Sequence, residues 1–124
     1  MSYIVHVLPQ SDWQRFKEQG EYRPDSLAEQ GFVHCSKLGQ IVVVADYNHS
    51  DDNEPVLLLL DESRIEAPVR YETDGKDAKS AFPHVYGPLK LDHLVEAFQF
   101  EQDETGFRLP EELLTDALIT SNPE

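Results

Sequence analysis

The chain is most apolar at Val56-Leu57-Leu58-Leu59-Leu60, and this run determines which fold the sequence predicts. The run is short enough to be a single strand, and its unbroken apolar character is typical of a strand buried on both faces. Pro55 precedes it, and the polar segment Asp61-Glu62-Ser63-Arg64 turns the chain away after it. We therefore expect residues 56–60 to form the central strand of a sheet.

Shorter segments on either side predict the remaining elements. Apolar alternation predicts further strands over residues 3–8, 32–35, 69–72, 84–86 and 94–101. Capping residues and helical patterns predict helices over residues 11–19, 27–30, 37–47 and 110–119, although residues 41–44 would also suit a strand. The patternless segments 48–54 and 73–81 are expected to be loops, and the second is placed to act as a lid. Because strands outnumber helices without alternating regularly with them, the expected class is α+β with a mostly antiparallel sheet.

The length and charge of the chain limit its function. A chain of 124 residues predicts a single domain, with residues 120–124 as a frayed tail. No apolar stretch approaches the roughly 18 residues that span a bilayer, and no export signal is visible, so the expected location is the cytoplasm. The formal charge of −14 argues against binding to nucleic acid or anionic membranes. Arg15, Arg23 and Arg70 still permit a small anionic ligand.

The sequence concentrates chemistry-bearing residues in two segments, Gly31-Phe32-Val33-His34-Cys35-Ser36 and Phe82-Pro83-His84-Val85-Tyr86-Gly87. Alternation along a strand places His34 on the same face as Phe32 and Ser36, and His84 on the same face as Tyr86. If the two strands adjoin, one cleft receives two imidazoles and two hydroxyl groups. The alternative is that each histidine is simply buried and hydrogen-bonded, as buried polar groups normally are.

Other common chemistries lack their sequence patterns. No metal site is expected, because the chain has no His-x-x-x-His or Cys-x-x-Cys spacing. Cys35 faces away from His34 in a regular strand, which argues against a cysteine nucleophile. Ser36 is explained by capping of the helix over residues 37–47. Among the acids we single out Glu72, which ends a predicted strand beside the lid; an exposed strand-end carboxylate is the alternative.

At these residues the chain resembles a known family. The segments that carry the resemblance are Tyr3-Ile4-Val5-His6, Ser11-Asp12-Trp13, Tyr22-Arg23-Pro24, the two histidine segments and Val69-Arg70-Tyr71-Glu72. Together they resemble the small bacterial proteins catalogued as domain of unknown function 952, over about residues 3–110. That family is similar in fold to the ADP-ribosyltransferase superfamily, whose members bind NAD in a cleft between two small sheets. The resemblance thus implies an ADP-ribosyltransferase-like fold, with NAD as a ligand and substrate.

The resemblance also implies roles for individual residues. His6 would lie on the nicotinamide-ribose side of NAD, and His34-Cys35-Ser36 looks like the His-x-Ser element with which the RNA 2′-phosphotransferase branch binds its nucleotide. Independently of the resemblance, Arg23 and Arg70 could each clamp a phosphate or carboxylate with the planar guanidinium, and the alternative is that each only neutralises part of the acidic surface. The chain departs from the classical transferases at the late strand, where they carry a catalytic glutamate and this sequence carries His84 and Tyr86.

Three functional hypotheses follow. In the first, an ADP-ribosyltransferase-like domain binds NAD or a related nucleotide, with His34 and Ser36 on the ribose or phosphate and Tyr86 stacked on the flat ring. His84 would act there as a hydrogen-bond donor or as a general acid or base. In the second, the same cleft is a non-catalytic module for a small molecule or a partner protein. The third is a hydrolase in which Glu72 is the base and a histidine the acid.

Overall fold

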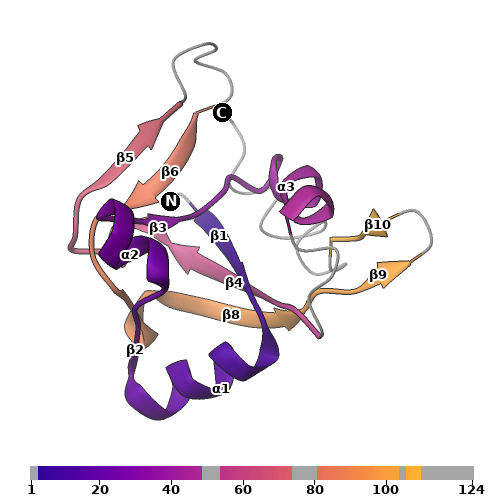
Figure 1. Cartoon of the computed structure of the whole chain (residues 1–124), viewed down its shortest axis with the longest axis horizontal. Coiled ribbons are helices and arrows are strands. Elements are labelled where there is room, and N and C mark those ends of the chain that lie inside the picture. The colour runs from indigo at the N-terminus through magenta and orange to yellow at the C-terminus, as the bar shows by residue number, and fades with distance from the viewer. Residues whose placement is uncertain (1–2, 49–53, 74–80, 104–105, 110–124) are drawn as a thin grey trace.

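The computed structural model describes residues 3–48, 54–73, 81–103 and 106–109 (Figure 1). The helices are α1 (Gln10–Gln19), α2 (Asp25–Gln30) and α3 (Ile41–Asn48), with 3-10 turns η1 (Glu62–Arg64) and η3 (Leu91–His93). The strands are β1 (Tyr3–Leu8), β2 (Glu21–Tyr22), β3 (Val33–His34), β4 (Val56–Asp61), β5 (Val69–Glu72), β6 (Phe82–Val85), β7 (Leu89–Lys90), β8 (Leu94–Gln99), β9 (Gln102–Asp103) and β10 (Gly106–Phe107). The predicted helix over 110–119, the tail and the greater part of both predicted loops lie outside the described residues.

The apolar run forms β4, the middle strand of a three-stranded sheet in the order β1-β4-β8. Every residue of β4 is buried, which confirms the prediction of a central strand. Both neighbours pair with β4 in the antiparallel sense. All strand pairs among the described residues are antiparallel, so the α+β class with mostly antiparallel sheets is confirmed.

Each face of this first sheet covers a separate hydrophobic cluster. Strand alternation in β1 sends Val5 and Val7 into one cluster, with residues of α3 and β10. It sends Ile4 and Leu8 into the other cluster, which also contains Phe16 of α1. The two faces of β1 are therefore both apolar, as the sequence predicted.

A second three-stranded sheet has the order β3-β6-β5 and stands beside the first (Figure 1). Its inner face contributes Val33, Cys35 and Val85 to the cluster around Phe16. One isolated bridge joins the two sheets, in which the backbones of Val5 and Ser36 exchange two hydrogen bonds of 2.9 Å. This bridge fixes the end of the segment that carries His34.

The same bridge corrects the prediction that Ser36 caps a helix over residues 37–47. The backbone of Ser36 pairs with β1 instead, and α3 begins only at Ile41. A turn precedes the helix, in which the Gln40 side chain accepts a hydrogen bond of 2.9 Å from the Lys37 backbone. The capping pattern depends only on neighbouring residues. The pairing of Ser36 with Val5, 31 positions earlier in the chain, determines its position instead.

Gly20 ends α1 as expected. Its φ of 84° lies in the left-handed region, and its N–H donates to the Phe16 carbonyl at 2.8 Å. The start of α1 differs from the prediction, because the N-cap residue is Pro9 and no side chain caps the helix. The turn predicted over residues 27–30 is extended to the six residues of α2.

Candidate functional site

The outer face of the β3-β6-β5 sheet brings the two histidine segments together. His34 lies directly opposite His84 in the register of β3 and β6, and Arg70 of β5 lies opposite His84 on its other side. Because cross-strand partners share a face, Phe32, Glu72 and Tyr86 project from the same side. We call Phe32, His34, Glu72, His84 and Tyr86 the histidine cluster.

The Glu72 carboxylate joins the members of the cluster through one oxygen. His84 Nδ1 lies 2.7 Å from Glu72 Oε1, and the Tyr86 hydroxyl donates to the same oxygen at 2.6 Å. Neither bond uses Oε2. The carboxylate is therefore oriented by two donors while its second oxygen stays outside both contacts.

These contacts determine which ring nitrogens carry hydrogen. A carboxylate only accepts, so His84 Nδ1 is the donor, and Nε2 carries the lone pair of the neutral ring. His34 Nε2 lies 2.7 Å from Gln30 Oε1, which also only accepts. With this orientation of the Gln30 amide, His34 Nδ1 is the lone-pair nitrogen, and each neutral ring presents one acceptor nitrogen that these contacts leave unused.

Ring contacts hold the imidazoles in place. Phe32 stacks on His84 with ring centroids 4.0 Å apart and an angle of 11° between the planes. His34 meets both rings edge-on, at 4.9 Å from Phe32 and 5.3 Å from His84. The guanidinium of Arg70 lies 5.2 Å above the Tyr86 ring, within the range of a cation–π contact. The cluster is thus packed as well as hydrogen-bonded.

Burial and hydrogen bonding set the protonation states. The His84 side chain is 13% exposed, and that of Glu72 is 37% exposed. Hydrogen bonds from Tyr86 and His84 lower the pKa of Glu72, while the bond to Glu72 raises the pKa of Tyr86. Desolvation and the neighbouring His84 lower the pKa of His34. At neutral pH the site therefore contains a carboxylate, a phenol and a neutral His34.

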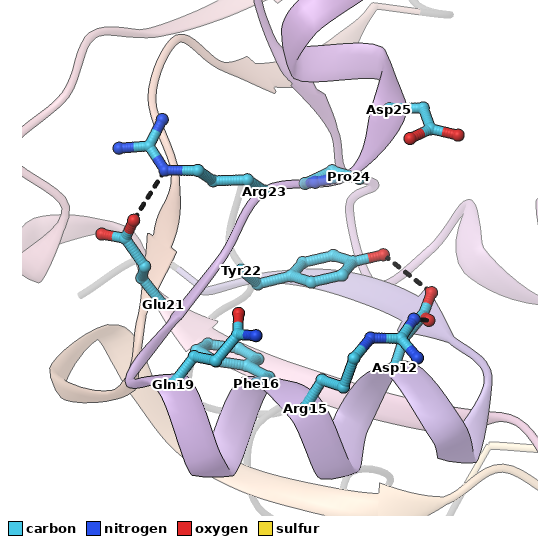
Figure 2. A pocket seen from close by; sticks show the side chains of 9 residues that line it. All are labelled: Asp12, Arg15, Phe16, Gln19, Glu21, Tyr22, Arg23, Pro24 and Asp25. Atoms are coloured by element: carbon cyan, nitrogen blue, oxygen red, sulfur yellow. Dashed lines mark hydrogen bonds and ion pairs between the residues drawn. The ribbon is translucent and has the colours of Figure 1, made fainter.

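The other residues expected from sequence lie outside the cluster. His6 Nδ1 lies 2.6 Å from the backbone oxygen of His34, so His6 supports the main chain of β3. Ser36 is buried and pairs with β1 through its backbone. Arg23 Nε bonds Glu21 Oε2 at 2.6 Å and lines a pocket of about 460 Å³ beside α1 (Figure 2).

Sequence reasoning did not assign roles to Phe32 or Gln30 in this site. It considered Arg70 as a clamp for an anion, and the structure places the Arg70 guanidinium over the Tyr86 ring. Alternation did place Phe32 on the face of His34, so its presence was accessible from the sequence. Gln30 reaches His34 from the last residue of α2, and no periodic signal predicts a contact between a helix end and a neighbouring strand.

Two negative findings apply to the described part of the chain. Within it, no three histidine, cysteine or acidic side chains are grouped so that they could hold a metal ion. None of its helices is long and apolar enough to cross a membrane.

The family of the chain is defined by comparison with known proteins. The model of the protein family of unknown function DUF952 matches residues 7–97, and the chain belongs to this family. No curated protein matches the chain.

Solved structures of a bacterial protein share the fold. The crystal structure of protein CC0527 from Caulobacter crescentus, a structural genomics target, is 25% identical, with a TM-score of 0.78 over 91% of this chain and 99% of that one. A double mutant of the same protein gives 25% identity and a TM-score of 0.77 over the same shares, 91% and 99%. Its solution NMR structure gives 24% identity and a TM-score of 0.73 over 95% and 99%.

Proposed function

We propose that the histidine cluster binds the ribose of a nucleotide, with NAD as the ligand that the resemblance to ADP-ribosyltransferases suggests. The observation that carries the proposal is the hydrogen-bonding character of the face. Glu72 Oε2, His84 Nε2 and His34 Nδ1 are all acceptors outside the contacts within the site. A ribose offers neighbouring hydroxyl donors, and the rings of Phe32 and Tyr86 suit an adjacent flat base.

Classical ADP-ribosyltransferases carry a catalytic glutamate on the late strand where this chain carries His84 and Tyr86. In the proposed site Glu72 of the adjacent strand β5 takes the place of that glutamate. Glu72 reaches His84 and Tyr86 across the β5-β6 pairing, in a register that sequence spacing does not reveal. The functional unit we propose is thus Glu72 together with His84, on an ADP-ribosyltransferase-like fold.

The proposed reaction uses both groups. The bond between the ribose C1′ and the nicotinamide nitrogen breaks, and nicotinamide leaves with the electron pair. The Glu72 carboxylate stabilises the positive charge that develops on the ribose, as carboxylates do in glycosidases. A hydroxyl oxygen of water or of an acceptor then bonds to C1′ and gives its proton to His84 Nε2.

Binding and turnover are tested separately. NAD, ADP-ribose and nicotinamide are titrated while amide NMR shifts are recorded, and we expect saturable shifts at residues 31–36, 70–72 and 82–87. Absence of shifts there at millimolar ligand would refute the proposal. Chromatographic release of nicotinamide then measures turnover, and Glu72→Gln should lower kcat by about a hundredfold or more, in addition to the affinity lost with the Oε2 acceptor.

The control variant is Glu96→Gln, which makes the same substitution on an exposed residue of β8 in the other sheet. It should leave both binding and turnover unchanged. Saturable binding without any nicotinamide release would favour the non-catalytic module instead, in which His34→Ala and His84→Ala weaken binding.

The contact of 2.7 Å between His84 and Glu72 also favours a second function, hydrolysis by a carboxylate–imidazole pair. Here Glu72 orients the ring, and His84 Nε2 takes a proton from the attacking water, so the base is the histidine rather than Glu72. Hydrolysis of 4-nitrophenyl esters or phosphodiesters that is lost in His84→Ala would support this function. The same rate in the variant would exclude it.

A further inference from the structure

A pocket of about 460 Å³ lies beside α1 and shares no residue with the histidine cluster (Figure 2). Most of its lining residues are polar or charged, and two, Phe16 and Tyr22, are aromatic. The Tyr22 ring stacks on Phe16 with centroids 5.7 Å apart and an angle of 22°, and Trp13 meets Phe16 edge-on at 5.6 Å. Phe16 is fully buried, so the Tyr22 ring has a fixed support.

The charges of the pocket are divided between its two ends. Figure 2 shows Arg23 and Glu21 at one end of the Tyr22 ring, where they form an ion pair of 2.6 Å. Asp12 and Asp25 lie at the hydroxyl end of the ring.

The hydroxyl end holds more negative than positive charge. Arg15 pairs with Asp12 through Oδ1. Among the described residues no ion pair reaches Asp25. Two carboxylates thus face one guanidinium at this end of the pocket.

The hydrogen bond and the pKa of the Tyr22 hydroxyl are consistent with an excess of negative charge at this end of the pocket. The hydroxyl donates to Asp12 Oδ2 at 3.5 Å. Burial raises the pKa of Tyr22, the charges of Asp12 and Asp25 raise it further, and Arg15 acts in the opposite direction. The negative charge of the carboxylates therefore outweighs the guanidinium at the ring.

We propose that this pocket binds a small organic cation with a primary ammonium group, held between Asp12 and Asp25 with its methylene groups on the Tyr22 ring. Ammonium donors form strong hydrogen bonds with carboxylates, and an aromatic face attracts the cation and covers its apolar stem. An anion is a poorer ligand, because both guanidinium groups are already paired and the chain carries a charge of −14. This site is independent of the function proposed for the histidine cluster.

The test is a titration with 1,4-diaminobutane at a constant ionic strength of roughly 0.15 M, which screens long-range attraction to the acidic surface. Amide NMR shifts should saturate and be largest at residues 12–15 and 22–25. Asp25→Asn should weaken binding about tenfold, since one charged hydrogen bond is lost. Asp25→Lys should abolish it, because the new ammonium competes for the same carboxylate.

Glu29→Gln provides the matched control. It removes the same charge from an exposed residue of α2 that does not line the pocket, and the affinity should change by less than about twofold. Far-UV circular dichroism checks that each variant is folded. Shifts spread evenly over acidic residues, equal weakening by Glu29→Gln and Asp25→Asn, or saturable shifts with phosphate but not with the diamine would each overturn the proposal.

Discussion

Gly87 follows Tyr86 at a point where the chain packs closely against the segment before β5. A Cβ atom added at Gly87 would lie 2.8 Å from the Cβ of Ala67. The φ of Gly87 is not positive, so the backbone itself accepts alanine, and the cost of Gly87→Ala comes from this contact. Carbon atoms in contact prefer about 3.5 Å or more, so the two segments must separate by about 0.7 Å.

The expected loss of stability in Gly87→Ala is about 1–3 kcal/mol, the usual cost of overpacking. For a chain of this length about 1 kcal/mol corresponds to roughly 4 °C, so Tm should fall by about 4–12 °C. The Tyr86 N–H donates to the Pro68 carbonyl at 2.8 Å beside the clash, so the shift should also disturb Tyr86 in the histidine cluster. Thermal unfolding followed by circular dichroism measures the loss.

A double-mutant cycle separates the contact from other effects. Ala67→Gly removes the atom that the new methyl group would meet, so the double variant should recover part of the loss. The coupling energy should be about 1 kcal/mol or more. An unchanged Tm in Gly87→Ala, or a coupling energy near zero, would show that the two segments are not packed as described.

Three further predictions concern protonation. Burial lowers the pKa of His93 below its ordinary 6.5, and the Lys90 backbone N–H donates to its Nδ1 at 3.0 Å, which requires the neutral ring. The unfolded chain therefore takes up this proton at higher pH than the folded chain. The free energy of unfolding should fall as pH drops below 6.5, and this one group can contribute at most about 1.4 kcal/mol per pH unit. Urea unfolding at several pH values measures the fall, and His93→Asn, which keeps an acceptor, should make it shallower; an equal slope in both proteins would contradict the assignment. Loss of the charge in Glu72→Gln should return the raised pKa of Tyr86 toward its ordinary value, as followed by NMR of ¹³C-labelled tyrosine, whereas an unchanged pKa would mean that the hydrogen bond is absent. Burial raises the pKa of the Cys35 thiol, so a disulfide reagent should modify it only after unfolding, and rapid reaction of the native protein would be inconsistent with the buried position.

The parts of the fold that could be predicted are those with a strong local period. The run from Val56 to Leu60 predicted the central strand, and alternation predicted which face of β1 each side chain occupies. Alternation also placed Phe32 with His34, and His84 with Tyr86, and separated all of them from Cys35. These inferences need only the geometry of one strand.

The parts that could not be predicted depend on pairing between distant segments. Glu72 meets His84 only because β5 and β6 are adjacent in a particular register, and a shift by one residue would place Glu72 on the opposite face. Ser36 was misread because its cap pattern is local, whereas its actual partner is Val5. For residues 41–44 the sequence suits a strand as well as a helix, and tertiary packing resolves the choice in favour of α3.

The bridge between Val5 and Ser36 has a consequence for the order in which the molecule assembles. It closes a loop of 31 residues, and the pairing of His34 with His84 closes one of 50 residues, taken as the differences of the paired positions. Closing such loops costs chain entropy before any contact compensates for it. Glu72 and His84 belong to the consecutive strands β5 and β6, so their contact forms across a short connection, whereas His34 joins them only when the longer loop closes. An NMR signal from the contact between the His34 and His84 rings therefore reports closure of that longer loop rather than formation of any single strand.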